Sequence, residues 1–164
     1  MTVKSDGSKL GLRDRDYLRT DEIEKIKLIL PNLKILLLST FENYIYHPDN
    51  IYELGLDGFE KDEYKTEIIK QKNNVLLDIV GEIGVARSHY IEFKDCIVND
   101  LNIKPITSML KSDNFDDFYA YFNMKKHFNK RFLSKFKYNL NDLATTNWFK
   151  NEILKILVNP QPHG

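Results

Sequence analysis

The sequence is poor in the residues that build linkers and disulfides. Among 164 residues there are seven glycines, five prolines and one cysteine, Cys96. So few glycines and prolines, together with 42% apolar residues, exclude a low-complexity or disordered chain and predict one packed domain. A single cysteine cannot form an internal disulfide, and the first residues lack the apolar stretch of a secretion signal. We therefore expect a reducing, cytoplasmic location.

Long hydrophobic runs are also missing. A helix that crosses a bilayer needs about 20 apolar residues in a row, whereas the longest apolar stretches, around 35–38 and 75–80, stand close to charged residues. The nucleotide-binding pattern G-x-x-x-x-G-K-[ST] does not occur, so any ATP hydrolysis would belong to a partner or to a missing region. None of the four histidines has a zinc-like spacing to Cys96. We expect a soluble protein without membrane association.

Positive and negative charges balance overall but not along the chain. Residues 1–60 contain 8 basic and 11 acidic side chains, and residues 111–164 contain 9 basic and 5 acidic ones. An acidic front and a basic back are typical of a metal-dependent enzyme on nucleic acid, because carboxylates hold the cation and ammonium groups meet phosphate. A difference of this size also arises by chance. Only 5 of the 24 basic residues are arginines, fewer than a base-reading surface favours.

The first third of the chain predicts a strand, a helix and a second strand. A short apolar-leaning run at 9–12 precedes two acids, and an apolar run at 33–39 lies between turn residues. Between them, acids at 21–24 and apolar residues at helical spacing predict a helix over 21–30. Strand, helix and strand form a βαβ unit, whose strands are parallel. We therefore predict an α/β fold with a small parallel sheet within residues 1–60.

The remaining residues, 61–164, predict a larger helical portion that packs on this unit in a single compact domain. Residues 88–97 do not alternate cleanly as a strand would and could continue as helix, so their structure stays open. Apolar residues at spacings of three and four indicate helices over 48–54, 61–80, 113–137, 140–145 and 147–158.

Two acids follow the first predicted strand at Asp14 and Asp16. Alternate side chains of a strand share a face, so this spacing predicts carboxylates side by side, and such oxygen donors suit Mg²⁺ or Mn²⁺. Glu42 follows the second strand, and the carboxyl ends of parallel strands meet at one edge of a sheet. The three carboxylates are therefore predicted to be neighbours. The other interpretation is a solvated turn, in which Arg13 and Arg15 neutralise the acids.

The segment 40–44 places an acid and an amide directly after an apolar strand. Glu42 could bind a metal ion or orient its water. Asn43 could hold a carboxylate, or it could cap the next helix, which is the simpler structural role.

Residues 125–137 contain six lysines or arginines and no acid. In a helix, Phe128, Phe132 and Phe136 would share one stripe, which is more typical of a core than of a base-stacking platform. The charged side chains would lie apart from this stripe, where they could be merely solvated or could contact phosphate. The candidate nucleic-acid-binding residues are Lys126, Lys130, Arg131 and Lys137.

Two motifs carry a resemblance to a known family. Gly11-Leu-Arg-Asp-Arg-Asp-Tyr17 is followed, after the predicted helix and second strand, by Leu38-Ser-Thr-Phe-Glu-Asn-Tyr-Ile-Tyr-His-Pro48. Together they resemble the TOPRIM-like domain of overcoming-lysogenisation-defect nucleases, and most of all the relatives that accompany ABC-type or AAA-type ATPases in phage defence. The similarity covers roughly residues 9–54, with fainter likeness at 122–126 and 146–149.

The resemblance implies a metal-dependent nuclease that acts on DNA or RNA. Asp14 and Asp16 would hold Mg²⁺ or Mn²⁺, and Glu42 would add an acid that positions the metal ion or its water. Lys125 or Lys126 would neutralise the charge that develops on the scissile phosphate.

The sequence departs from this family at its beginning. The family starts with an earlier strand that ends in a catalytic glutamate, and the residues before Leu10 have no room for that strand and contain no glutamate. We therefore expect the carboxyl-terminal part of such a protein: a fragment, a piece that another polypeptide completes, or a degenerate member kept for binding. The alternative function is a non-catalytic interaction or sensor subunit that docks a partner ATPase or a completing chain.

Overall fold

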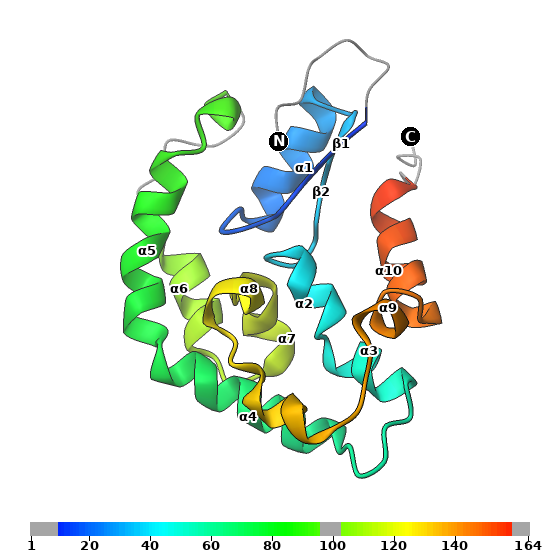
Figure 1. Cartoon of the computed structure of the whole chain (residues 1–164). Coiled ribbons are helices and arrows are strands. Elements are labelled where there is room, and N and C mark those ends of the chain that lie inside the picture. The colour runs from blue at the N-terminus through cyan, green and yellow to red at the C-terminus, as the bar shows by residue number, and fades with distance from the viewer. Residues whose placement is uncertain (1–9, 96–102, 159–164) are drawn as a thin grey trace.

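A two-stranded parallel sheet forms the amino-terminal part of the fold (Figure 1). Strand β1 (Gly11–Arg13) pairs with β2 (Leu33–Ile35) in a register that sets Gly11 opposite Leu33. Helix α1 (Thr20–Ile29) connects the two strands. The predicted unit of strand, helix and parallel strand is confirmed.

The computed structural model describes residues 10–95 and 103–158. Cys96 and the first residue of the predicted strand over 9–12 lie outside these ranges. Within them, no helix is both long and apolar enough to cross a membrane.

Both strands are shorter than predicted. β2 ends at Ile35, although the apolar run continues to Leu38. Beyond the strand, the backbone amides of Leu37 and Leu38 donate to the hydroxyl of Tyr44, at 2.9 and 3.1 Å. A side chain from the next helix has thus replaced a neighbouring strand as the partner of these amides.

Helix α1 covers one face of the sheet. Its buried Ile23 and Ile26 pack with Leu33 and Ile35 of β2 and with Phe93. The apolar residues whose helical spacing predicted this helix are therefore the ones that pack it against the sheet.

Helices make up most of the rest of the described chain. After β2 come α2 (Phe41–Ile45), α3 (Pro48–Glu53), α4 (Lys61–Asn74), α5 (Leu76–Ser88) and α6 (Lys104–Lys111). The later helices are α7 (Phe115–Phe118), α8 (Met124–His127), α9 (Leu140–Leu143) and α10 (Asn147–Leu157). Short 3-10 helices are η1 (Ile91–Phe93), η2 (Tyr119–Tyr121) and η3 (Lys130–Lys135).

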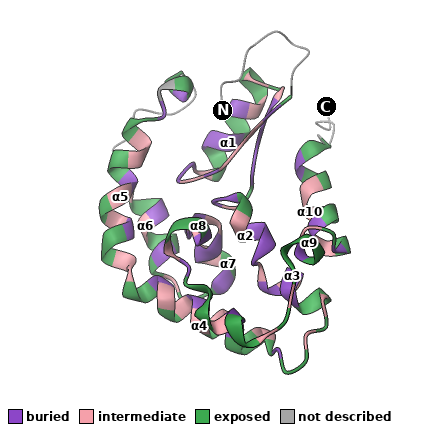
Figure 2. Cartoon of the chain, viewed as in Figure 1, coloured by how far each residue is buried: buried purple, intermediate pink, exposed green. Residues whose placement is uncertain are grey.

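A second, larger core fills the helical portion. Tyr64 and Ile68 of α4, Ile79 of α5 and Phe118 of α7 are fully buried in it. The outer sides of α4 and α5 are largely exposed (Figure 2). Helix α10 returns to the side of β2, so the end of the described chain packs near its beginning (Figure 1).

The predicted helix over 61–80 is two helices. At Val75 the backbone leaves the helical path (φ −113°, ψ 10°), and its amide bonds to the carbonyl of Lys72, three residues back. Helix α5 then continues through Gly81 and Gly84. Its apolar inner face is buried in the core, and this burial outweighs the weak helix propensity of glycine.

The predicted helix over 113–137 is wrong, because the chain here forms α7, η2, α8 and η3 in succession. Three of these segments start at an asparagine whose side chain accepts a later backbone amide. The pairs are Asn114 with Asp116, Asn123 with Lys126, and Asn129 with Arg131. Such caps begin new helices, so Phe118, Phe122 and Phe128 are buried, and Phe132 and Phe136 partly buried, without sharing one helix.

Candidate metal and phosphate site

The loop after β1 is shaped by the buried side chain of Arg15. Its Nε and Nη1 donate to the carbonyls of Leu18 and Leu37, each at 2.9 Å. Its Nη2 donates to the hydroxyls of Thr20 and Tyr121, at 3.1 and 3.0 Å. Arg15 therefore ties the loop to the end of β2 and to η2, so it does not neutralise a solvated turn.

Asp14 and Asp16 lie in this loop and not on the strand. Asp16 has a left-handed backbone conformation (φ 50°), and its amide donates to the carbonyl of Ser39 at 3.0 Å. The two acids do not stand on a strand as predicted, because β1 ends at Arg13 and the chain then turns. Burial and the negative charge of Asp14 raise the pKa of Asp16, so the two carboxylates are still within electrostatic reach of each other. Aspartate tolerates a positive φ better than most side chains, at some cost in backbone energy.

Asp16 faces an internal arginine. The guanidinium of Arg13 lies over the rings of Tyr90 and Phe93, 4.9 and 4.8 Å from their centroids, and its Nε donates to Glu92 at 3.1 Å. Nη1 of Arg13 is 3.7 Å from Oδ2 of Asp16. Burial raises the pKa of Asp16, and Arg13 only partly offsets this rise. Asp16 thus already has a cation beside it.

Asp14 is the residue at which predicted site residues converge. Burial raises its pKa, and the negative charge of Glu42 raises it further. The ammonium of Lys125 acts in the opposite direction, as does a hydrogen bond from the backbone amide of Phe41. Glu42 and Lys125 therefore both lie within electrostatic reach of Asp14, although the three residues come from a loop, α2 and α8.

The buried side chain of Asn43 sets α2 against the segment that leads into α8. Its Nδ2 donates to the carbonyls of Tyr119 and Phe122, at 3.1 and 2.7 Å. Its Oδ1 accepts the amides of Met124 and Thr40, each at 3.2 Å. Asn43 thus caps its own helix; it neither holds a carboxylate nor caps the next helix, the two alternatives that the sequence left open. It also joins two segments that are distant in sequence.

Lys126 is engaged by a different acid. Its Nζ lies 2.7 Å from Oε1 of Glu82 on α5, and Nε2 of His127 lies 3.2 Å from Oε2. The hydroxyl of Tyr17 donates to the same carboxylate at 3.4 Å. Burial by itself raises the pKa of Glu82, but the hydrogen bonds from Lys126 and His127 outweigh it and lower the pKa. Lys125, by contrast, has no ion-pair partner among the described residues.

The other predicted nucleic-acid-binding residues occupy a separate surface. Nζ of Lys130 lies 4.7 Å from the centroid of the Tyr46 ring. Helix η3 packs on α4, where Phe132 stacks on Tyr64 with centroids 5.7 Å apart, far from the sheet in Figure 1. Lys130, Arg131 and Lys137 are all exposed, as is Lys135 between them.

Two carboxylates, those of Asp14 and Glu42, would be the ligands of a cation at this site. Among residues 10–95 and 103–158, no group of three or more histidine, cysteine, aspartate or glutamate side chains is arranged to hold a metal ion. Asp14 and Glu42 supply two carboxylates, and Mg²⁺ is commonly held by one or two carboxylates, several waters and substrate phosphates. A cation there would also relieve the repulsion that helps to raise the pKa of Asp14.

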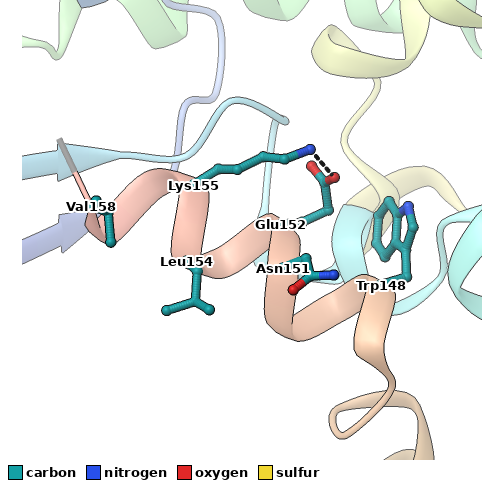
Figure 3. A pocket seen from close by; sticks show the side chains of 6 residues that line it. All are labelled: Trp148, Asn151, Glu152, Leu154, Lys155 and Val158. Carbon is teal, nitrogen blue, oxygen red and sulfur yellow. Dashed lines mark hydrogen bonds and ion pairs between the residues drawn. The ribbon is translucent and has the colours of Figure 1, made fainter. Parts of the chain in front are cut away.

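A pocket of about 690 Å³ lies elsewhere, along α10 (Figure 3). Trp148, Leu154 and Val158 contribute to its wall, and Nζ of Lys155 pairs with Glu152 at 2.7 Å beside them. None of its described lining residues belongs to the predicted site, so this pocket does not carry that chemistry.

Two buried groups that hold these elements together were not predicted. Asn50 donates from Nδ2 to the carbonyls of Ile45 and Leu143, each at 2.9 Å. Glu22 receives Nη1 and Nη2 of Arg87 at 2.7 and 2.8 Å, which joins α1 to α5. An asparagine among apolar residues is a signal that Asn50 is buried. Its partner Leu143, however, lies 93 residues further along the chain, so no local pattern indicates this hydrogen bond.

No protein-family model matches the chain, and no curated protein and no solved structure matches it either. The resemblance to TOPRIM-like nucleases therefore stays a prediction that rests on the two motifs. The function has to be inferred from the geometry around Asp14.

Proposed function

We propose that the protein is a metal-dependent phosphodiesterase that acts on DNA or RNA, with Asp14 and Glu42 as the acids of its site. The observation that carries this proposal is the convergence of three residues. Asp14 accepts a backbone amide of α2 beside Glu42, and Asn43 accepts a backbone amide of α8 beside Lys125. Two carboxylates that hold a cation and an ammonium group that offsets charge on phosphate are side chains that metal-assisted phosphoryl chemistry uses.

The three residues divide two roles between them in this proposal. Asp14 and Glu42 hold the cation, and a bound Mg²⁺ or Mn²⁺ polarises a phosphate oxygen and lowers the pKa of its water. Lys125 offsets the negative charge that develops on the phosphate. Asp16, which faces Arg13, positions the loop that carries Asp14.

The basic surface supplies contacts to the nucleic-acid backbone. Lys126 forms an ion pair with Glu82, so its main role is to orient α8 and not to contact phosphate. The exposed side chains of Lys130, Arg131 and Lys137 remain for that contact. Binding through them should weaken as the salt concentration rises. The loss of one phosphate contact should reduce the slope of log K against log salt concentration by about one.

A cleavage assay with the purified full chain tests the proposal. Plasmid DNA and a transfer RNA are incubated with Mn²⁺, with Mg²⁺ or with EDTA, and we expect cleavage of at least one substrate that EDTA abolishes. Asp14→Asn and Glu42→Gln should each lower the rate by about 10²-fold or more. Asp57→Asn, at an exposed position, is the matched control and should leave the rate unchanged. Equal rates in all four proteins, or no cleavage with either metal ion, would overturn the proposal.

One observation favours a second candidate, the non-catalytic interaction or sensor subunit. Among the described residues, no third acid is arranged with Asp14 and Glu42 to hold a metal ion. A subunit of this kind would dock a partner ATPase or a completing chain and would neither bind Mn²⁺ nor cleave nucleic acid. Calorimetric titration of the full chain with Mn²⁺ separates the two functions, since only the phosphodiesterase requires a heat of binding that Asp14→Asn removes.

A further inference from the structure

The carboxylate of Glu82, on α5, connects two parts of the proposed site that are distant in sequence. Its Oε2 accepts a hydrogen bond of 3.4 Å from the hydroxyl of Tyr17, which follows Asp14 by three residues. Its Oε1 accepts Nζ of Lys126 at 2.7 Å, and its Oε2 lies 3.2 Å from Nε2 of His127. One side chain of α5 therefore joins the loop after β1 to α8.

Backbone contacts of Tyr17 fix the loop at one end of this connection. Its amide donates to the hydroxyl of Tyr90 at 3.2 Å, and its carbonyl accepts Nη1 of Arg87 at 2.9 Å. Arg87 lies on α5, as Glu82 does, so this helix holds Tyr17 at two points. Because Tyr17 is also buried, it has little freedom to move relative to α5.

The other end of the connection, α8, is fixed as well. The ring of His127 lies at an angle of 17° to that of Phe122, with centroids 6.3 Å apart. At the start of the same short helix, Asn43 accepts the amide of Met124. Contacts at both ends of α8 thus fix its rotation about its own axis.

The groups that meet at Glu82 have defined roles as donors and acceptor. Burial by itself raises the pKa of Glu82, but the hydrogen bonds from Lys126 and His127 outweigh it and lower the pKa. Burial raises the pKa of Tyr17 well above its usual range, and the negative charge of Glu82 raises it further. Near neutral pH, Glu82 is therefore an ionised acceptor and Tyr17 a neutral donor.

Glu82 also distinguishes two adjacent lysines. Successive side chains of an α-helix point about 100° apart, so Lys125 and Lys126 cannot both face α5. With Lys126 paired to Glu82, Lys125 points to another side of α8, where its charge opposes the rise that burial and Glu42 cause in the pKa of Asp14. The pair of Glu82 and Lys126 is partly exposed, and such pairs add little stability. Its main consequence is therefore orientation.

We propose that Glu82 is a positioning residue of the phosphodiesterase site, which holds Lys126 against α5 and thereby sets Lys125 at a fixed distance from Asp14. This inference rests on the proposed function, because it assigns a role in the same site. Glu82 acts on cleavage through Lys125 and has no contact with the phosphate. The hydroxyl of Tyr17 ties the loop of Asp14 to the same carboxylate.

Steady-state kinetics of the full chain, with Mn²⁺ and a nucleic acid that the unaltered chain cleaves, test this role. Glu82→Ala should lower kcat about tenfold, because Lys125 is no longer held in place. KM should change by less than about twofold, since the basic surface around η3 is unaltered. The matched control is Glu152→Ala, which removes a lysine ion pair of the same 2.7 Å length and similar exposure. It should leave both constants unchanged.

A double variant separates positioning from a general loss of structure. In the Lys125→Ala background, Glu82→Ala should lower kcat by less than about a further twofold, because the residue through which it acts is gone. A merely structural role would lower kcat by the same factor in both backgrounds. Tyr17→Phe removes one hydroxyl and keeps the buried ring, so it serves as a milder variant. It should lower kcat about threefold with Lys125 present and not without it.

Lysine labelling with acetic anhydride tests the ion pair without any cleavage. Mass spectrometry compares the labelling of Lys125 and Lys126 in the unaltered chain and in Glu82→Gln. The label on Lys126 should rise about threefold or more in the variant, because its ammonium loses a charged partner. The label on Lys125 should change by less than about twofold, since Lys125 does not pair with Glu82.

Several results would overturn the inference. They are an unchanged kcat in Glu82→Ala and Tyr17→Phe, equal losses of kcat with and without Lys125, or equal labelling of Lys126 in the two proteins. Each of these leaves the proposed function in place when the unaltered chain cleaves. Absence of cleavage by the unaltered chain, in contrast, overturns the phosphodiesterase and this inference with it.

Discussion

The carbonyl oxygen of Phe122 accepts a hydrogen bond of 2.7 Å from Nδ2 of Asn43, across 79 residues of sequence. Oδ1 of the same side chain accepts the amide of Met124 at 3.2 Å. Glu42 precedes Asn43, and Lys125 follows Met124. One buried amide group therefore sets the position of an acid on α2 relative to a lysine on α8.

Loss of this amide group should destabilise the fold strongly. Asn43→Ala leaves the amide of Met124 and the carbonyl of Phe122 buried without a partner, so we expect the free energy of unfolding to fall by about 2–4 kcal/mol. Urea denaturation measures the change. Asn151→Ala, at an exposed position on α10, should change stability by less than about 0.5 kcal/mol. Similar losses in the two variants would contradict the role of Asn43.

Removal of the charge of Asp14 should stabilise the protein near neutral pH. Burial and Glu42 raise the pKa of Asp14, so the folded state holds the proton more tightly than the unfolded chain does. The ionised form therefore lowers stability at pH values above the ordinary pKa of aspartate. Asp14→Asn should raise the free energy of unfolding by about 0.5 kcal/mol at about pH 7, and the gain should vanish at acid pH.

Thermal denaturation of Asp14→Asn at several pH values measures this gain. Saturating Mn²⁺ should raise the melting temperature of the unaltered chain and leave that of the variant unchanged, because only a chain that binds the ion is stabilised by it. A variant that is less stable than the unaltered chain near neutral pH would contradict the assignment of Asp14.

His47 should make the fold sensitive to mild acid. Burial lowers its pKa to about 4 from an ordinary 6.5. The ring stacks on Trp148 with centroids 4.5 Å apart, and Nδ1 accepts the amide of Asp49 at 3.0 Å. The unfolded chain takes up the proton at a higher pH than the folded state does. Stability should therefore fall as pH drops from about 6.5 to about 4, by up to about 3 kcal/mol.

The variant His47→Asn isolates this contribution. Asparagine keeps a helix-capping acceptor for Asp49 but does not titrate in this range. The free energy of unfolding of the variant should decline less steeply between pH 6.5 and 4 than that of the unaltered chain, as followed by urea denaturation at each pH. Parallel curves for the two proteins would show that His47 is not buried in its neutral form.

Lys125 and Lys126 should differ sharply in their effect on cleavage. Lys125 has no ion-pair partner among the described residues and acts on Asp14, whereas Lys126 pairs with Glu82 at 2.7 Å. Lys125→Ala should lower the cleavage rate by about 10²-fold. Lys126→Ala should lower it by no more than about threefold, since it breaks an exposed ion pair. The cleavage rates are measured with plasmid DNA and Mn²⁺. A larger loss for Lys126→Ala than for Lys125→Ala would assign the phosphate contact to Lys126 instead.

The parallel sheet and α1 could be predicted because local pattern and tertiary packing agree there. The apolar residues of α1 recur at the helical period, and β2 is apolar apart from Lys34 in a run bounded by turn residues. The predicted helix over 113–137 failed for a physical reason. The spacing of the aromatic residues correctly indicated burial, but the asparagine caps at Asn123 and Asn129 divide the segment.

The site could be predicted only in part. The motifs proposed Asp14, Glu42 and Lys125 or Lys126, and the structure sets Glu42 and Lys125 within electrostatic reach of Asp14. The orientation of Asp16 depends on a left-handed backbone conformation that strand alternation does not predict. The role of Asn43 depends on carbonyls that lie far away in sequence, so no local pattern indicates it.

Paramagnetic broadening by Mn²⁺ tests the central claim most directly. In the ¹⁵N-labelled full chain, substoichiometric Mn²⁺ should broaden the amide signals of Phe41 and Glu42 first and that of Lys125 next. In Asp14→Asn these signals should stay sharp. Broadening centred on the exposed acids of another element, or an unchanged pattern in Asp14→Asn, would contradict a metal-assisted phosphodiesterase site at Asp14 and Glu42.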